Sequence, residues 1–202
     1  MAEHAILLML SVSRKLLIAN ASISKGEFDP KAYKGIELKD KTIGIVGAGN
    51  IGGRIGEIAK GFGMKVLFVD SKTSRNKFEE ILSQSQYLSI NTPLTPKTEK
   101  LIGEKEFSLL PKGAIVINTS RGKVIDEMEL VKQLQNGHLG GAGLDVFEKE
   151  PPKKDNPLFT LANVVATPHI AWNTAESQHR LAEGVVTNIE AFCAGKPIHI
   201  VS

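Results

Sequence analysis

The chain has 202 residues, of which 42% are hydrophobic and 23% are charged, enough for one full core or for one large domain with part of a second. Its formal net charge is only +3, and the basic residues are scattered, which argues against a nucleic-acid partner. The single cysteine, Cys193, excludes an internal disulfide, and no Cys/His spacing predicts a metal site. We expect Cys193 to be a packing residue.

The first predicted element is a helix over residues 2–20, with apolar positions at helical spacing. Its run Ala5–Leu10 is too short to span a bilayer, and Arg14 and Lys15 follow soon after. The run is therefore interpreted as an amphipathic or buried helix rather than an export signal. This predicts a cytoplasmic protein without a membrane partner. The polar stretch 22–41 is predicted to be a loop.

From residue 42 onward, short apolar runs alternate with helical patterns. The predicted strands are 42–46, 64–69, 87–91, 114–118, 141–145 and 163–166; the predicted helices are 50–61, 77–85, 105–109, 127–136 and 174–194. This alternation indicates an α/β fold, a Rossmann-type doubly wound parallel sheet with helices on both faces. The chain is interpreted as a single cofactor domain with flanking N- and C-terminal helices.

A glycine-rich turn joins the first predicted strand to the next helix. Gly47 permits the tight turn, Gly49 lets the backbone approach a pyrophosphate, and Gly52 lets the helix pack on the strand. The N–H groups of Asn50 and Ile51 would then face the phosphates at the positive end of the helix. The alternative, ordinary turn glycines, fits the surrounding strand–turn–helix–strand context less well.

An acidic residue, Asp70, ends the second predicted strand, 21 residues after Gly49 (70 minus 49). A carboxylate there accepts hydrogen bonds from adenosine ribose hydroxyls and repels a 2′-phosphate, so NAD is the predicted cofactor. Lys72 and Arg75 lie close by in sequence and leave NADP open as an alternative.

Three later segments follow predicted strands at the edge where α/β sheets bind ligands: Asn118–Gly122, Gly143–Phe147 with Glu150-Pro151 beyond it, and Thr167–Trp172. In this order after the glycine turn, they resemble the D-isomer-specific 2-hydroxyacid dehydrogenases over essentially the whole chain. Asn91–Thr95 is similar to that family too, although the family often has His at the position of Asn91.

The resemblance implies that Arg121, Glu150 and His169 are the catalytic residues. Arg121 would grip a substrate carboxylate with its planar guanidinium and polarise the adjacent 2-oxo group. His169 would donate a proton to the carbonyl oxygen, and Glu150 would favour its imidazolium form. Each residue alone also has an ordinary structural explanation, such as a loop histidine or a salt-bridged arginine. Their joint occurrence in family order favours catalysis.

The resemblance also assigns further residues to the cofactor site, with Asp145 at the nicotinamide end. Added to the glycine turn and Asp70, these residues are Thr92, Pro93, Thr98, Thr119, Ser120, Asp145 and Ala171. Asp145 alone would equally suit a helix cap. Trp172 is a weak substrate hint, as in relatives similar to glycerate and hydroxypyruvate reductases. The remaining histidines, 4, 138, 179 and 199, are predicted to be surface or packing residues.

The resemblance divides the chain into a linking helix (1–22), an NAD-binding Rossmann domain (23–172), and a C-terminal helix with a remnant of the substrate domain (173–202). Relatives usually begin with a substrate-domain segment, which we expect to be absent here. The stretch from Asp70 to Phe78 is also expected to be shorter than in relatives. Because relatives dimerise through the cofactor domain, a homodimer is expected.

The predicted function is NAD-dependent interconversion of a small 2-oxo acid and its D-2-hydroxy acid, of the glyoxylate, hydroxypyruvate or phosphoglycerate type. The alternative is a non-catalytic, NAD-binding and dimerising fragment of such an enzyme. A weaker alternative is a scaffold that only dimerises.

Overall fold

The computed structural model describes residues 1–200, which form two compact units, Met1–His169 and a second that begins at Ile170. The second unit contains one long helix, α7 (Ala175–Cys193), none of whose residues is buried. The prediction that Cys193 is a packing residue is wrong, because its side chain is exposed.

The first unit is built on a parallel sheet of six strands, in the spatial order β2-β1-β3-β4-β5-β6. The strands are β1 (Thr42–Val46), β2 (Lys65–Val69), β3 (Tyr87–Ile90), β4 (Ala114–Asn118), β5 (Leu139–Leu144) and β6 (Val164–Ala166). Every residue of β3 and β4 is buried, as expected for strands covered on both faces. The predicted Rossmann-type α/β fold is confirmed.

Strand order reverses at β1, which pairs with β2 on one side and with β3 on the other. The connections after β1 and β3 therefore leave the sheet in opposite directions, which opens a crevice at the carboxyl ends of these strands. The sheet thus places its ligand-binding edge beside the glycine-rich turn.

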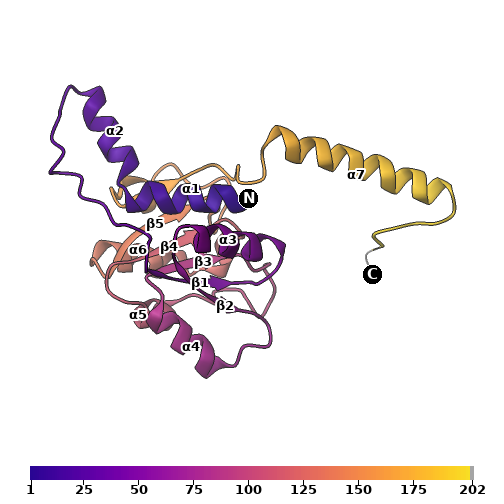
Figure 1. Cartoon of the computed structure of the whole chain (residues 1–202), viewed down its shortest axis with the longest axis horizontal. Coiled ribbons are helices and arrows are strands. Elements are labelled where there is room, and N and C mark those ends of the chain that lie inside the picture. Colours follow the sequence, from indigo (N-terminus) through magenta and orange to yellow (C-terminus); the bar gives the residue numbers. More distant parts are fainter. Residues whose placement is uncertain (201–202) are drawn as a thin grey trace. The chain divides into compact units, whose positions relative to one another are not determined.

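Two helical layers cover the sheet (Figure 1). One layer holds α1 (Ala2–Ser13) and α3 (Asn50–Gly61), and its cluster of buried residues includes Leu8, Ile45 and Ile117. The other holds α4 (Arg75–Gln84), α5 (Glu104–Leu109) and α6 (Glu127–Gln135). Two 3-10 turns, η1 (Gly122–Val124) and η2 (Pro157–Thr160), complete the unit.

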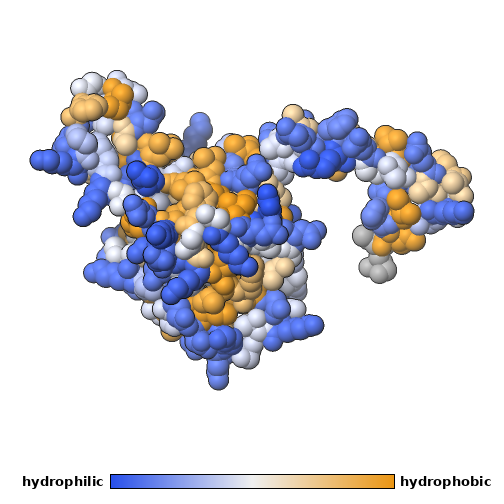
Figure 2. Space-filling view, in the orientation of Figure 1, coloured by the Kyte–Doolittle hydropathy of each residue, from blue (hydrophilic) through white to orange (hydrophobic). Residues whose placement is uncertain are grey.

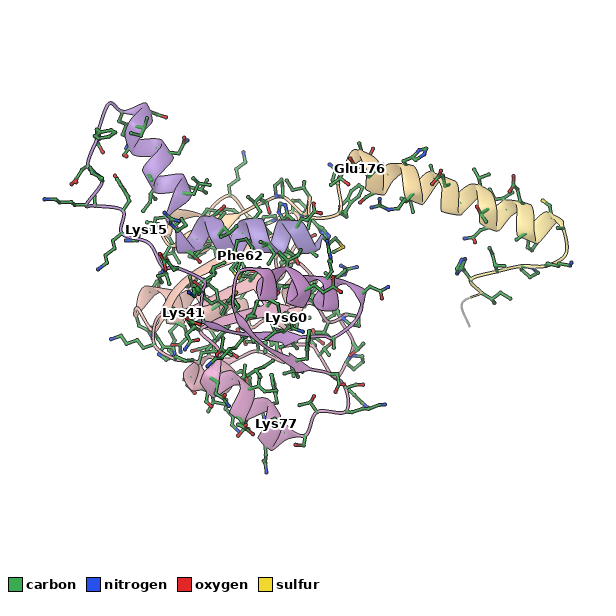
Figure 3. The ribbon with its side chains drawn as sticks, viewed as in Figure 1. Lys15, Lys41, Lys60, Phe62, Lys77 and Glu176 are labelled. Atoms are coloured by element: carbon green, nitrogen blue, oxygen red, sulfur yellow. The ribbon has the colours of Figure 1, made fainter. Side chains whose placement is uncertain are left out.

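The N-terminal helix is broken, which corrects the predicted single helix over 2–20. After α1 the chain turns at Lys15 and continues as α2 (Leu16–Ser24) (Figure 3). Lys15 has left-handed backbone angles, φ 53° and ψ 36°, and this conformation interrupts the helical hydrogen-bond ladder. The predicted loop over 22–41 accordingly begins only after Ser24.

The two N-terminal helices differ in burial. Helix α1 buries Ala5, Leu8 and Met9 in the core, whereas α2 buries only Ser22. Within residues 1–200, no single helix is long and apolar enough to cross a membrane, and α1 with α2 meets that criterion only as a pair bent by 63°.

Connections on the two edges of the sheet differ in character. The connections at the carboxyl edge are the segments that the sequence analysis singled out. The connection between β2 and α4 is short and consists of residues 70–74. At the amino edge, the turns into β2, β4 and β5 pass through Gly63, Gly113 and Gly137, each with positive φ. Glycine adopts positive φ at little steric cost, and Gly63 and Gly137 each directly follow the C-cap residue of a helix.

Candidate active site

The glycine-rich turn brings β1 against the end of β3. Gly47 has φ 102°, and a Cβ built there would lie 2.5 Å from the carbonyl oxygen of Asn91. A Cβ on Gly52 would lie 1.9 Å from the carbonyl oxygen of Gly47. Both positions therefore require glycine, because any side chain would collide with backbone atoms.

Gly49 is different, because a Cβ at this position would meet no atom within 4 Å. Gly49 is the N-cap of α3, and no side chain caps the helix. The first-turn amides of α3, including those of Asn50 and Ile51, have no acceptor within the helix. The turn thus exposes N–H donors at the positive end of a helix dipole, which suits an anionic ligand.

A cleft of about 780 Å³ runs from this turn past the ends of β2 and β3. Six of the predicted cofactor residues line it: Gly47, Gly49, Asp70, Thr92, Pro93 and Thr98. The hydroxyl of Thr98 donates to the carbonyl oxygen of Pro93 at 2.7 Å and accepts from the amide of Thr95 at 2.8 Å. These bonds fix the loop after β3 as one wall of the cleft.

Asp70 lies at the opposite wall, immediately after β2. Its Oδ1 accepts hydrogen bonds from the Thr73 hydroxyl and the Lys72 amide, both at 2.9 Å. These two bonds, the Thr73 bond first, hold the pKa of the Asp70 carboxyl below its ordinary value. Asp70 therefore presents a fixed negative charge at the position where a ribose diol is expected.

Two buried polar atoms lie at the ends of neighbouring strands without a partner. Within residues 1–200, Oδ1 of Asn91 and Oγ1 of Thr119 make no hydrogen bond. The register pairs Ile90 with Asn118, so the residues that follow them lie side by side. Because buried polar atoms in proteins are nearly always hydrogen-bonded, the pair fits a bound polar group. The exposed amides of the glycine turn suit the phosphates of a dinucleotide.

A histidine–carboxylate pair stands at the ends of β5 and β6. Nδ1 of His169 lies 2.6 Å from Oε2 of Glu150, and the other carboxylate oxygen, Oε1, accepts from the amide of Phe147 at 3.0 Å. Both side chains are about one-third exposed, at 37% and 35%. They line a pocket of about 410 Å³ together with Phe147, Phe159 and Pro168. The carboxylate therefore orients the imidazole at an accessible site.

Arg121 follows β4 on a segment that is tightly held. Oδ1 of Asn118 accepts from the amide and the hydroxyl of Ser120, and the Asn118 side-chain amide donates to the carbonyl oxygen of Arg121. A Cβ on the next residue, Gly122, would lie 1.9 Å from the backbone of Phe147. The Arg121 segment therefore packs directly against the segment that leads to Glu150. The exposed guanidinium of Arg121 donates to the carbonyl oxygen of Ser120 at 2.7 Å.

Asp145 is completely buried, and it lies beside His4, a residue that the sequence analysis did not assign to the site. Its Oδ1 accepts from the Thr167 hydroxyl at 2.5 Å, and Nε2 of His4 lies 3.0 Å from that hydroxyl oxygen and 3.5 Å from Oδ1. Because Thr167 donates its one hydrogen to Asp145, the His4 ring donates to Thr167. The helical spacing of His4 and the buried Leu8 is the signal that would have placed this histidine on the core face.

The predicted site residues thus fall into groups. Six line the cleft, while Thr119, Ser120, Asp145 and the three predicted catalytic residues stand at the ends of β4, β5 and β6. Asn50, Ile51 and Gly52 form the first turn of α3. Ala171 lies in the second compact unit, so its role remains a prediction.

This fold and glycine turn define a dinucleotide-binding α/β protein. The family model described as "D-isomer specific 2-hydroxyacid dehydrogenase, NAD binding domain" matches residues 6–171. The chain belongs to this family, and the matched part is its NAD-binding domain. The resemblance inferred from the sequence motifs is confirmed.

Individual relatives agree with this assignment. A glyoxylate reductase of Thermococcus litoralis is 42% identical across 96% of this chain, which spans 64% of that relative's length. A D-lactate dehydrogenase of Aquifex aeolicus, solved with NAD and lactic acid, matches 96% of this chain and 66% of its own, with 32% identity and a TM-score of 0.86. An acyclic imino acid reductase, solved with NADPH and D-Arg, matches all of this chain and 67% of its own, with 36% identity and a TM-score of 0.91.

Proposed function

We propose that the protein is an NAD-dependent oxidoreductase that interconverts a small 2-oxo acid and its D-2-hydroxy acid. The observation that carries the proposal is the 2.6 Å contact between His169 and Glu150. This pair stands at the same edge of the sheet as the dinucleotide cleft. Histidine oriented by a carboxylate is a suitable general acid and base for a carbonyl–alcohol interconversion.

The residues present suit each part of the reaction. A bound nicotinamide supplies or accepts the hydride. The Nδ1 hydrogen of His169 is directed at Glu150, so Nε2 would donate a proton to the carbonyl oxygen during reduction and take it back during oxidation. The guanidinium of Arg121 would hold the substrate carboxylate and polarise the neighbouring oxygen.

Glyoxylate, hydroxypyruvate and, in the oxidative direction, phosphoglycerate are the candidate substrates. The likeness to a glyoxylate reductase supports the first of these. We also propose a cytoplasmic location, on the ground that the one cysteine has a free, exposed thiol.

A steady-state assay of NADH oxidation with each 2-oxo acid tests this proposal. His169→Ala and Arg121→Ala are each expected to lower kcat/KM by at least about a hundredfold, the usual scale for a general acid. Calorimetry on the same variants is expected to show unchanged NADH binding. If the unaltered chain binds NADH but shows no turnover, the proposed oxidoreductase activity is contradicted. That result would favour the alternative, a non-catalytic NAD-binding fragment.

We further propose a homodimer formed through α2. Helix α2 and the segment after it expose the apolar side chains of Leu16, Leu17, Ile23 and Phe28, of which Phe28 is 85% exposed (Figure 2, upper left). A hollow of about 290 Å³ at the base of α2 is lined by apolar groups that include Val12, Leu17 and Ile36. Exposed apolar side chains next to an apolar hollow suit a self-complementary interface, in which each copy inserts its side chains into the hollow of the other.

Light scattering at several protein concentrations tests this dimer. The double variant Leu17→Glu, Ile23→Glu is expected to be monomeric, because it places charges in the apolar contact. Met128→Glu is the control, since Met128 is 82% exposed and belongs to α6, outside the proposed interface. A monomeric unaltered chain, or a dimer that survives both glutamates, contradicts the proposed interface.

A further inference from the structure

A cation, Arg75, lines the cofactor cleft close to Asp70. The connection after β2 has only five residues, 70–74, so α4 begins at the mouth of the cleft and Arg75 is its first residue. Arg75 lines the cleft together with Asp70, Ser71 and Thr73. An arginine near the end of the second strand is the group that accommodates the 2′-phosphate of NADP. Arg75 at this position would therefore favour NADP, whereas Asp70 favours NAD.

Two carboxylates already engage this arginine. Nε of Arg75 donates to Oε1 of Glu79 at 2.6 Å, and Nη2 donates to Oε1 of Glu106 at 2.5 Å. The guanidinium carbon also lies 5.6 Å from the centre of the Phe78 ring. Charge-assisted bonds to two acids on separate helices fix the direction of the guanidinium and neutralise its charge.

The two acids are themselves held in place. Glu106 is 7% exposed, and its other oxygen, Oε2, accepts from the amide of Gly103 at 3.0 Å. Glu79 also contacts Nζ of Lys105 at 2.7 Å. The carboxylates are thus part of a network that spans α4 and α5. Arg75 cannot turn toward a phosphate without breaking two short ionic bonds.

We propose that Glu79 and Glu106 mask Arg75, so that the cleft favours NADH over NADPH although it contains a potential receptor for the 2′-phosphate. The inference rests on the proposed cofactor site. It assigns cofactor discrimination to a pair of acids behind the cleft, in addition to the charge of Asp70. Without the mask, Arg75 would be available to a ligand anion at the same wall.

Fluorescence titration of the full chain with NADH and with NADPH tests the mask. Glu79→Gln with Glu106→Gln removes both charges while keeping side-chain size and a hydrogen-bond acceptor. This double variant is expected to bind NADPH about tenfold more tightly, the scale of one charge-assisted bond, and NADH as before. Adding Arg75→Gln is expected to reverse the gain.

Glu80→Gln is the matched control, because Glu80 is an acid of the same helix that pairs with Lys77 at 2.7 Å and does not line the cleft (Figure 3 labels Lys77). Glu79→Gln alone leaves the Gly103 contact of Glu106 intact, so it serves if the double variant is unstable. An NADPH affinity no higher than that of Glu80→Gln, or a gain that survives Arg75→Gln, overturns the mask.

The outcomes also separate this inference from the proposed function. An unaltered chain that binds neither dinucleotide contradicts the cofactor site itself. An unaltered chain that binds NADH, with variants whose NADPH affinity is unchanged, contradicts only the mask.

Discussion

At the residue scale, the side chain of Thr119 carries a buried polar atom whose burial lowers the stability of the free protein. Its hydroxyl is buried at the end of β4, and within residues 1–200 it has no hydrogen-bond partner. A buried hydroxyl without a partner costs about 1–3 kcal/mol of folding free energy. One reason for a native protein to retain such a group is that a bound molecule supplies the missing partner.

Thr119→Val is therefore expected to change stability and binding in opposite directions. Valine has nearly the same shape without the hydroxyl, so the free energy of unfolding is expected to rise by about 1 kcal/mol. The affinity for NADH is expected to fall. Urea unfolding and NADH titration measure the two effects, and a variant that loses stability would contradict the view that the hydroxyl lacks a partner in the free protein.

The glycines of the cofactor turn give a second residue-scale prediction. Gly52→Ala is expected to lower the free energy of unfolding by ~3 kcal/mol, because its Cβ would lie 1.9 Å from a backbone oxygen. Gly49→Ala is expected to leave stability unchanged, since its Cβ would meet nothing, but to weaken NADH binding by filling the space of the pyrophosphate.

Gly53 provides the control for both substitutions. It lies in the same helix, and its Cβ would also meet no atom within 4 Å. Gly53→Ala is expected to raise the free energy of unfolding by about 0.5–1 kcal/mol through helix propensity. Equal losses of NADH affinity in Gly49→Ala and Gly53→Ala would show that the methyl group introduced by Gly49→Ala does not act at the phosphate site.

At the scale of elements, a side-chain hydrogen bond joins α1 to β3. The Tyr87 hydroxyl of β3 lies 3.0 Å from Oγ of Ser13 at the end of α1. Burial raises the pKa of the Tyr87 hydroxyl above its ordinary value, and the bond to Ser13 opposes this shift in part. A raised pKa in the folded state means that this stabilising contribution is complete below the ordinary tyrosine pKa and is lost as the pH rises through the folded value.

Tyr87→Phe is expected to lower the free energy of unfolding at neutral pH by about 1 kcal/mol, the value of one hydrogen bond. The difference from the unaltered chain is expected to shrink in alkaline solution, where ionisation destabilises only the tyrosine form. Urea unfolding curves across the alkaline range measure this, with Tyr33→Phe in the 25–41 loop as control. A difference that stays constant with pH would refute the argument.

Elements were predictable where burial leaves a recognisable apolar pattern in the sequence. The strand Ala114–Asn118 matches its predicted bounds because parallel strands covered on both faces are continuous apolar runs. The break at Lys15 left no such record: apolar residues continue across it, and neither Gly nor Pro marks the left-handed turn. The local sequence pattern therefore predicts the strands of the sheet. It does not predict a change of helix direction that no glycine or proline marks.

The candidate site was predictable where sequence motifs cover it. Glu150 and His169 were paired by their motifs, and the structure brings them into contact. The contacts of His4 with Thr167 and of Arg75 with Glu106 join residues 163 and 31 positions apart. Such pairs depend on how helices pack on the sheet, which spacing along one chain does not encode.

At the scale of the whole molecule, the first unit contains both hydrophobic cores. Every buried residue of the two clusters precedes residue 170. Helix α7 buries no residue and exposes a row of apolar side chains: Leu181, Val185, Val186, Ile189 and Phe192. Such a row promotes association without contributing to the core.

Deleting residues 174–202 is therefore expected to change the free energy of unfolding of the first unit by less than about 1 kcal/mol. The shortened chain is also expected to be more soluble, because the exposed row is removed. Urea unfolding followed by circular dichroism, together with a solubility measurement, tests both points. Loss of the cooperative transition would show that the second unit supports the first.

The glycine turns on the amino edge of the sheet have a practical consequence. Gly113 and Gly137 are exposed there, at the end of the sheet opposite the cleft. The exposed neighbour Lys112, replaced by cysteine in a Cys193→Ser background, gives a single thiol for a dye or a surface linker. A dye attached at that edge would label the protein without blocking the cleft. A surface linker attached there would leave the entrance of the dinucleotide cleft facing the solution.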